Sequence, residues 1–328
     1  MFADGYGVAT VIPIKDLASF TLRRARKDSL SIFLWRMLRF LFISPFLLRY
    51  SVLRGRDLIE REIMGSGMLL DSRDKGISQD LLVNGLREPF LTEIINDEIK
   101  DGEVIVDIGA NIGYYVLQES LLVGQRGKVY AIEPVHGNIE ILERNIRLNG
   151  YENIEVFELA IGDKNGMGEI MVSELRNRSS MVASGMSYIY SSPIEIVMLD
   201  TFLQGKRHPD IIKMDVEGYE YEIIRGCKEL LASGRPLKIF MELHFDILLD
   251  KSIEIVKMLK DAGFILKEAC FELHPAVMKS RLGMMVISFL DGRLGAATGH
   301  QDIDIEDLLN DEKYRTGQVE NLELFFER

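Results

Sequence analysis

The chain has 328 residues, of which 47% are hydrophobic and 27% charged, which is typical of a folded globular protein with a sizeable core. The net charge is −12, but residues 1–60 hold ten basic and five acidic residues, which leaves 29 basic and 46 acidic residues, a net charge of −17, for the rest. So acidic a body repels phosphate backbones, which argues against DNA or RNA as the main substrate. The two cysteines, Cys227 and Cys270, exclude a disulfide framework and a four-cysteine zinc site, and they favour a cytoplasmic location.

The first 60 residues are expected to form a basic and apolar helical extension. Residues 31–50 are the most hydrophobic stretch, but three arginines interrupt it and Pro45 would kink a helix, so it is a poor transmembrane span. Two interpretations stay open for residues 20–56. Their mixture of basic, aromatic and aliphatic side chains suits peripheral contact with an anionic membrane surface, or they pack on the domain or on a second copy of the chain in a homo-oligomer.

Residues 61–328 show the alternation of strands and helices that is typical of a single α/β domain. Since helical crossovers join most of the strands, we expect a mostly parallel, doubly wound sheet. The strands are expected at residues 67–71, 104–107, 128–133, 154–159, 211–216, 237–243 and 264–269, and the helices at 79–84, 89–99, 112–123, 138–148, 219–231 and 252–261.

Two segments depart from this pattern. Residues 162–193 are rich in Gly, Ser, Asn and Met, and we expect them to form an insertion beside the sheet whose loops shape a substrate pocket. After residue 272 the pattern weakens, and the place of the last strands in the sheet is not predicted. The elements expected in and next to these segments are short strands at 169–172, 194–199, 284–290 and 322–326 and a short helix at 305–309.

The segment from Val104 to Gly113, Val-Ile-Val-Asp-Ile-Gly-Ala-Asn-Ile-Gly, is the most informative part of the chain. A β-branched run ends at Asp107 and continues into a turn with Gly109 and Gly113, which is typical of a ligand-binding turn at the end of a parallel strand. A carboxylate stands where a phosphate-binding turn has glycine. Because two anions at contact distance repel each other, the ligand is not expected to be a pyrophosphate.

A second carboxylate, Glu133, follows the next strand, 24 positions after Gly109, where an acidic residue binds the two hydroxyls of an adenosine ribose. S-adenosylmethionine contains such a ribose, and its methionine end carries an ammonium group that an acidic turn attracts. The alternative is that Asp107 only caps the following helix and that the glycines only permit a tight turn and close helix packing.

Four motifs in this order resemble the FkbM-type methyltransferases, a family within the large Rossmann-like S-adenosylmethionine-dependent group. The resemblance covers roughly residues 65–270, and it implies the class I methyltransferase fold and methylation of a hydroxyl oxygen on a small molecule, a sugar or a lipid headgroup. The acceptor itself is not implied. The motifs are Asp107 to Gly113, Glu133-Pro134 with Asn138, Leu199-Asp200 followed by Lys213-Met214-Asp215-Val216-Glu217-Gly218-Tyr219-Glu220, and Glu242-Leu243-His244.

The resemblance also implies where the cofactor binds. Asp107, Gly109 and Asn111 would line its methionine part. Glu133 would hold the ribose, and residues 160–162 would border the adenine. The complete set of expected cofactor-binding residues is Asp107, Gly109, Ala110, Asn111, Gly113, Glu133, Asn138, Ala160, Ile161, Asp215 and Glu217.

Methyl transfer to oxygen is an in-line displacement that needs a base near the acceptor hydroxyl. His244 is the first candidate, because an imidazole titrates near neutral pH and Glu242, two residues earlier, is placed to orient it; Asp215 is the second. Lys213 either neutralises these carboxylates, binds an anionic acceptor or pairs with Asp215. The residue types of Asp215, Glu217, Glu242 and His244 permit a divalent metal without requiring one, and no metal is predicted.

Two other classes of function compete with a methyltransferase. An NAD(P)-dependent oxidoreductase would also need a parallel sheet and Glu133 on a ribose, but it predicts a pyrophosphate glycine loop and a Tyr-x-x-x-Lys pair, and the sequence has neither. A non-catalytic, membrane-peripheral nucleoside-binding protein would explain the basic and apolar first 60 residues. It predicts cofactor binding without turnover.

Overall fold

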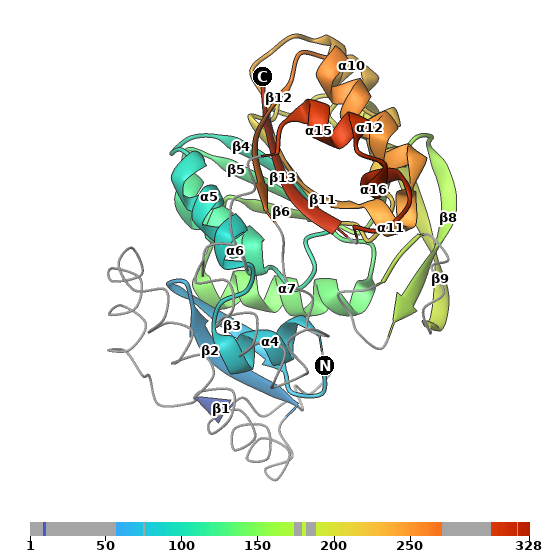
Figure 1. Cartoon of the computed structure of the whole chain (residues 1–328). Helices are drawn as coiled ribbons and strands as arrows, with labels where there is room; N and C mark the ends of the chain where they lie inside the picture. Colours follow the sequence, from blue (N-terminus) through green and yellow to red (C-terminus); the bar gives the residue numbers. More distant parts are fainter. Residues whose placement is uncertain are drawn as a thin grey trace, which may run out of the picture.

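In a computed structural model of the chain, the described residues are 9–10, 57–74, 76–173, 179–181, 188–270, 303–319 and 321–328. Residues 11–56 of the expected N-terminal extension and the expected strand at 284–290 lie outside them. Within the described ranges, strands and helices alternate in the expected order along the domain (Figure 1).

The centre of the molecule is a seven-stranded sheet in which neighbouring strands are parallel, except that β13 runs antiparallel to both of its neighbours. This confirms the expected mostly parallel sheet. The chain moves outward in opposite directions from β4 and β10, and such a switch point is where open α/β sheets bind ligands at the carboxyl ends of their strands. Across the sheet the strands are β12 (Ile265–Cys270), β13 (Asn321–Glu327), β11 (Lys238–His244), β10 (Ile211–Met214), β4 (Val104–Ile108), β5 (Lys128–Ile132) and β6 (Ile154–Phe157).

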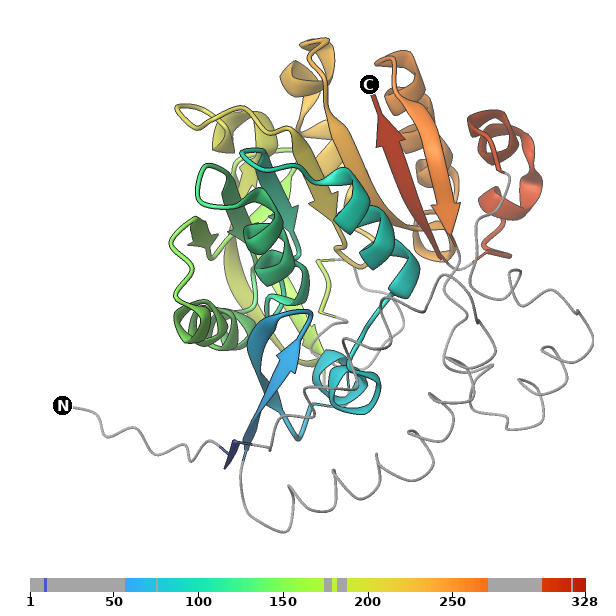
Figure 2. The same cartoon turned by 90° about the vertical axis from the view of Figure 1, so that its left-hand side faces the viewer.

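Helices contribute to a hydrophobic core on each face, so the sheet is doubly wound as expected (Figures 1 and 2). In the part of the chain that the structure describes, no helix has both the length and the apolar character needed to cross a membrane. One core includes α4 (Ile77–Asn84), α5 (Pro89–Glu98), α6 (Tyr114–Val123) and α7 (His136–Asn149). The other includes α8 (Leu199–Phe202), α9 (Glu220–Arg225), α10 (Lys228–Ala232), α11 (Phe245–Leu248), α12 (Asp250–Asp261), α15 (Ile305–Asn310) and α16 (Glu312–Arg315).

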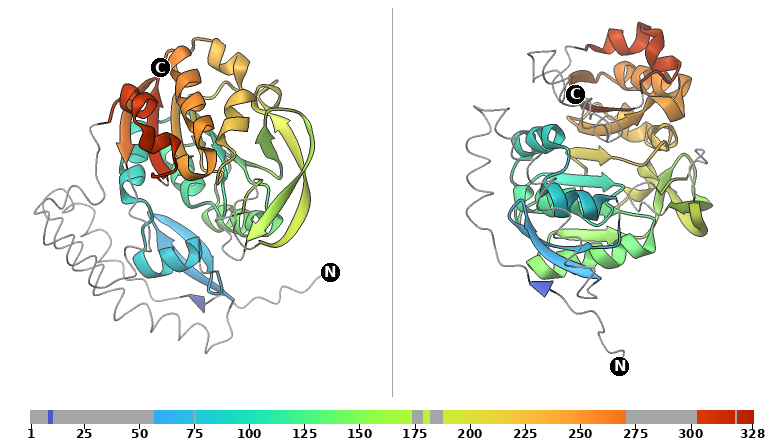
Figure 3. Two further views of the ribbon diagram at one scale, coloured as in Figure 1. Left: turned by 45° about the vertical axis from the view of Figure 1, so that its right-hand side comes forward. Right: turned by 60° about the horizontal axis from the view of Figure 1, so that its bottom comes forward.

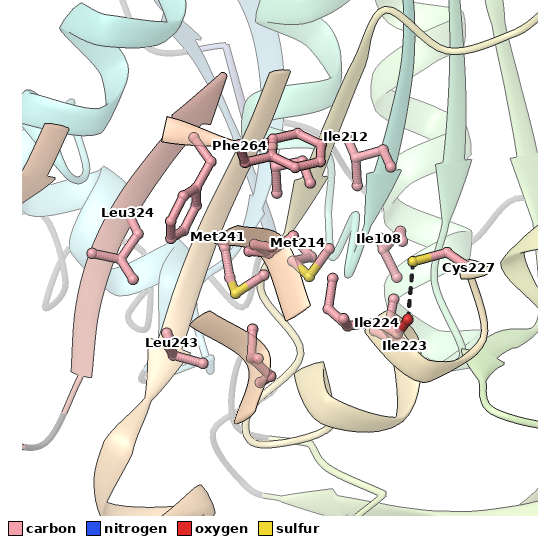
Figure 4. Close-up of a cluster of buried hydrophobic side chains, with 14 of the residues drawn as sticks. Ile108, Ile212, Met214, Ile223, Ile224, Cys227, Met241, Leu243, Phe264 and Leu324 are labelled. Carbon is pink, nitrogen blue, oxygen red and sulfur yellow. Dashed lines mark hydrogen bonds between the residues drawn. The ribbon is translucent and has the colours of Figure 1, made fainter. Parts of the chain in front are cut away.

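Strand β4 shows how one sequence builds both cores. Val104, Val106 and Ile108 are buried in the core of α9 to α12, whereas Ile105 is buried in the core of α5 to α7, and the alternation of side chains places Asp107 on that second side. Figure 4 shows the core of α9 to α12, where Ile108 lies near the methionines of β10 and β11 and the isoleucines of α9. Each fully buried aliphatic side chain contributes about 1.5–3 kcal/mol, so a register shift of one residue is strongly disfavoured.

A small sheet of three strands, β1 (Ala9–Thr10), β2 (Leu58–Ile63) and β3 (Ser66–Asp71), lies beside α7. Two asparagines of α7 hold β3 by its backbone. The Asn145 side chain accepts from Leu69 N and donates to Ile112 O, and the Asn149 side chain accepts from Gly67 N and donates to Gly67 O. Asn145 therefore links the small sheet directly to the turn that follows β4.

The expected insertion is a separate sheet of β7 (Ala160–Gly162), β9 (Tyr188–Met198) and β8 (Gly166–Ser173). Its two long strands form a ribbon at one side of the molecule (Figure 3). The structure differs from the sequence prediction at Gly226, where the helix expected at 219–231 divides into α9 and α10. A Cβ atom on Gly226 would overlap the carbonyl oxygen of Gly162, so the contact with β7 requires glycine here, and glycine is unfavourable inside a helix.

The glycine of the turn after β4 can be tested by substitution. Gly109 has a φ of +89°, and an added Cβ would overlap the carbonyl oxygen of Asp215. Gly150, at the end of α7, has a φ of +66° and nothing within 4 Å of an added Cβ. We expect Gly150→Ala to lower the free energy of unfolding by about 1 kcal/mol through backbone strain alone, and Gly109→Ala to lower it clearly further. Denaturant unfolding measures both, and equal losses would contradict the contact with Asp215.

Candidate functional site

Two adjoining cavities lie at the carboxyl ends of β4 and β10. Cavity A is lined by residues that follow β4, β5, β6 and β10 and by the insertion. Cavity B, the smaller of the two, lies between the turn after β4 and the first turn of α6. The two share Gly109, Asn111 and Asp215, so one elongated ligand can occupy both.

The predicted cofactor residues divide between these cavities. Cavity A is lined by Gly109, Asn111, Glu133, Asn138, Ala160, Ile161, Asp215 and Glu217. Cavity B is lined by Asp107, Gly109, Ala110, Asn111, Asp215 and the predicted charge partner Lys213. Gly113 is in neither lining: it starts α6 with a φ of +93°, and an added Cβ would lie 2.6 Å from Cδ1 of Leu142.

The turn after β4 is tight because alternate residues in it have left-handed backbone. Gly109 has a φ of +89° and Asn111 a φ of +49°, which is uncommon for a residue other than glycine. The N–H groups of Gly109 and Ala110 donate to the carbonyl oxygen of Ile132, at 2.9 and 3.0 Å. These bonds hold the turn against the end of β5, where Glu133 follows.

Glu133 is buried and its carboxylate is held by three donors. Oε2 accepts from Asn111 N at 2.8 Å, and Oε1 accepts from Val135 N and Asn138 Nδ2, both at 3.0 Å. Burial raises the pKa of Glu133 to about 7, although these donors oppose the shift. The carboxylate thus has a fixed orientation at the wall of cavity A, and its ionised form is well placed to accept hydrogen bonds from a pair of hydroxyls.

Asp107 and Lys213 are opposite each other on β4 and β10 and form a buried ion pair, with Lys213 Nζ 3.3 Å from Asp107 Oδ1. Nζ also lies 4.6 Å from the centre of the Tyr115 ring. Burial lowers the pKa of Lys213, but the nearby carboxylates of Asp107 and Asp215 outweigh it and raise that pKa overall. Burial raises the pKa of Asp107 despite Lys213. Lys213 therefore stays positively charged and pairs with Asp107.

His244 ends β11 and is surrounded by carboxylates. Its Nδ1 lies 2.7 Å from Oε1 of Glu220, a fully buried residue in the first turn of α9. Its Nε2 lies 3.5 Å from Glu217 Oε2 and 3.7 Å from Glu242 Oε1. Glu220, rather than the predicted Glu242, makes the short contact that orients the imidazole. Glu242 itself accepts a hydrogen bond from Asn321 Nδ2.

The charge of this cluster controls what it can do chemically. Burial lowers the pKa of His244, but Glu220 and Glu242 outweigh it and hold that pKa well above its usual value. Burial, followed by the charge of Asp215, raises the pKa of Glu242 well above its usual range, although His244 opposes the shift. The cluster therefore favours the protonated forms of Glu242 and His244, and His244 becomes a base as the pH rises through its raised pKa.

Three residues of the same region have the geometry of a cation site. Asp215, Glu217 and His244 each offer one ligand atom, and these atoms lie within 4.8 Å of one another. Carboxylate oxygens and an imidazole nitrogen suit a divalent cation. The predicted absence of a metal stays a prediction.

Several site residues were missed by the sequence analysis. Glu220 belongs to one of the four motifs but was not among the expected site residues, and its Oε1 also accepts from Gly218 N at 3.1 Å. Ile170, Ser179 and Met181 of the insertion line cavity A. Only the composition of residues 162–193 pointed to this segment: it predicted a loop that shapes the pocket, but not which side chains line it.

The fold and the two cavities fit the S-adenosylmethionine-dependent methyltransferase class. Residues 107–266 match the family model of the methyltransferase FkbM domain. The resemblance noted from the motifs is thereby confirmed.

The chain is similar in sequence to several named methyltransferases, over different shares of its length. The hexuronic acid methyltransferase AglP of Haloferax volcanii is 25% identical over 195 residues, which are 55% of this chain and 76% of AglP. The protein-L-isoaspartate O-methyltransferase 1 of Archaeoglobus fulgidus is 35% identical over 66 residues, 20% of this chain. The chain spans only 29% of the length of that enzyme and 35% of the corresponding enzyme of Fervidobacterium nodosum.

Solved structures resemble the chain at lower identity. TYW2 of M. jannaschii, in complex with AdoMet, is 15% identical and has a TM-score of 0.38, with 83% of this chain and 87% of that chain covered. Fibrillarin of Aeropyrum pernix, with natively bound S-adenosyl-L-methionine, is 17% identical and has a TM-score of 0.35, with 54% and 63% covered.

The role of Glu133 can be tested by cofactor binding. We expect Glu133→Ala to weaken S-adenosylmethionine binding by about 10- to 100-fold, because two hydrogen bonds to a charged acceptor are lost. The affinity of the unsubstituted protein should rise as the pH increases through about 7, because the carboxyl of Glu133 becomes ionised in that range. Calorimetry measures both effects. Glu143→Ala, an exposed change on α7, is the control, and an unchanged affinity in a folded Glu133→Ala variant would refute the assignment.

Proposed function

We propose that this chain is an S-adenosylmethionine-dependent O-methyltransferase whose acceptor is a hydroxyl of a carbohydrate or a carbohydrate-containing small molecule. The observation that carries the proposal is the pair of joined cavities, which are lined mostly by residues of the segment that matches the FkbM domain. Cavity A offers the Glu133 carboxylate to a ribose, and cavity B offers acidic groups to an ammonium. The shared residues Gly109, Asn111 and Asp215 then lie at the middle of the ligand, where the sulfonium would be.

The cluster around His244 supports transfer to oxygen. The sulfonium already activates the methyl carbon, so the protein has to align the acceptor and remove its proton as charge develops. Asp215 and Glu217 line cavity A, and Glu217 is 3.5 Å from His244 Nε2. His244 itself lines neither cavity, so a hydroxyl held beside Asp215 and Glu217 would face the methyl group and would reach the imidazole of His244 through Glu217.

A carbohydrate acceptor is supported by two observations. AglP, named a hexuronic acid methyltransferase, is matched over 76% of its own length. The acceptor side of the site is rich in carboxylates, and carboxylates accept hydrogen bonds from the neighbouring hydroxyls of a sugar. We also propose the cytoplasm as the compartment, from the scarcity of cysteine in the sequence.

Binding and transfer assays test this function. Calorimetry on the purified chain should show binding of S-adenosylmethionine and S-adenosylhomocysteine and none of NAD or NADP. Transfer of a labelled methyl group should then be strongest to sugars and uronic acids in an acceptor panel. Binding of a dinucleotide without the sulfonium pair would refute the proposal in favour of an oxidoreductase, and binding without transfer to any hydroxyl acceptor would favour a non-catalytic protein.

The base can be tested separately from cofactor binding. We expect His244→Ala to retain S-adenosylmethionine affinity and to lower turnover by about 100-fold or more, since a positioned base contributes about that much. His136→Ala, an exposed histidine on α7, should leave turnover unchanged. In the unsubstituted enzyme turnover should rise as pH increases through the raised pKa of His244, and Glu220→Gln should move that rise to lower pH. A pH profile unaffected by Glu220→Gln would remove His244 as the base.

A further inference from the structure

Cavity B is lined by charges of both signs. The residues that line it include the acidic Asp107 and Asp215 and the basic Lys213 and Arg87. Two carboxylate oxygens here, Oδ2 of Asp107 and Oδ1 of Asp215, are buried and have no hydrogen-bond donor among the described residues. Asp107 is completely buried, and a buried acceptor without a donor is costly unless a ligand supplies one. The cavity is therefore suited to a ligand that carries a hydrogen-bond donor and, next to it, an anionic group.

Arg87 was not singled out in the sequence, and the structure holds it firmly beside the cavity. The hydroxyl of Tyr114, in the first turn of α6, donates to the carbonyl oxygen of Arg87 at 2.9 Å, and Arg87 N lies 3.1 Å from the same hydroxyl. Thr92 Oγ1 donates to that carbonyl oxygen at 3.0 Å. The backbone of Arg87 is therefore tied to the helix that begins at the cofactor turn.

The neighbouring residue, Glu88, orients the guanidinium. Glu88 is buried and forms an ion pair with Nε of Arg87, and its other oxygen accepts from Tyr115 at 2.5 Å. To make these contacts Glu88 adopts left-handed backbone, with φ 43° and ψ 63°, which is unfavourable for a residue with a side chain. Strained backbone of this kind is concentrated at ligand-binding sites, where surrounding contacts maintain it.

We infer that Arg87 binds the carboxylate of the methionine end of S-adenosylmethionine. This inference rests on the proposed function, which already assigns the ammonium group to the acidic residues of cavity B. A methionine end is a zwitterion, and two acidic residues and an arginine line this one small space. A guanidinium matches a carboxylate with two parallel N–H donors, and part of its donor set is used by Glu88.

The carboxylate is assigned to the cofactor rather than to an acidic acceptor because of the position of cavity B. It shares Gly109, Asn111 and Asp215 with cavity A, so it continues the adenosine site. Among the described residues, its lining does not include Glu217, Glu242 or His244, which surround the predicted acceptor hydroxyl. An acceptor carboxylate at Arg87 would therefore lie away from the group that removes the acceptor proton.

A binding cycle with two ligands and two proteins tests the inference. Decarboxylated S-adenosylmethionine keeps the ammonium and the adenosine and lacks only the carboxylate. The unsubstituted protein should bind S-adenosylmethionine about 10- to 100-fold more tightly than the decarboxylated form. Arg87→Gln should bring the affinity for S-adenosylmethionine down to that of the decarboxylated form, whose own affinity should change little. Calorimetry measures the four dissociation constants.

Two further variants separate binding from folding. Arg87→Lys keeps a cation beside the buried Glu88 and should retain an intermediate preference for the carboxylate. Arg126→Ala, which removes an exposed arginine paired with Asp101, should keep the full preference. Equal weakening of both ligands by Arg87→Gln and Arg87→Lys, or an unchanged preference in both, would overturn the inference.

The remaining outcomes are also distinct. An unchanged cofactor preference, combined with a loss of activity toward uronic acids but not toward neutral sugars, would overturn the inference and assign Arg87 to the acceptor. If the unsubstituted protein bound neither ligand, the proposed function itself would fail, a result that is visible before any variant is made.

Discussion

The buried ion pair of Asp107 and Lys213 is the interaction on which the rest of the site depends. The two residues are register partners on β4 and β10, the strands on either side of the switch point, and both side chains are almost completely buried. Removing either partner would leave an uncompensated charge in the core, which typically costs about 3–5 kcal/mol. The pair therefore fixes the relative register of the two strands whose ends carry the cofactor turn and the Asp215 loop.

A second electrostatic cluster occupies the other side of Asp215. Around His244 the chain places Glu217, Glu220 and Glu242, so the imidazole has more carboxylates than it can neutralise. Asp215 lies between the two clusters and lines both cavities. In the proposed function, Asp215 is thus the one carboxylate that lies between the methyl donor and the cluster that would accept the proton.

Local patterns in the sequence predicted the parts of the site that follow neighbouring strands. Asp107 and Glu133 come directly after β-branched runs, so their convergence at one edge of the sheet could be foreseen. The approach of Glu220 to His244 could not, because it depends on how α9 is oriented after the left-handed residues Glu217 and Gly218. The place of β13 in the sheet could not be predicted either, because a hydrophobic run does not determine which strands it pairs with. Its antiparallel position between β11 and β12 depends on contacts such as the stacking of Phe325 on Phe240.

The backbone contact between Gly109 and Asp215 limits how the chain can vary in length. With no space even for one carbon atom between these loops, an inserted or deleted residue in either would separate the cofactor turn from the acidic loop. The ribbon of β8 and β9 is held mainly by its own pairing and by β7, so its length can change while the central sheet keeps its shape. A change in the length of this ribbon would therefore reshape one wall of cavity A, while the turn after β4 and the Asp215 loop keep their geometry.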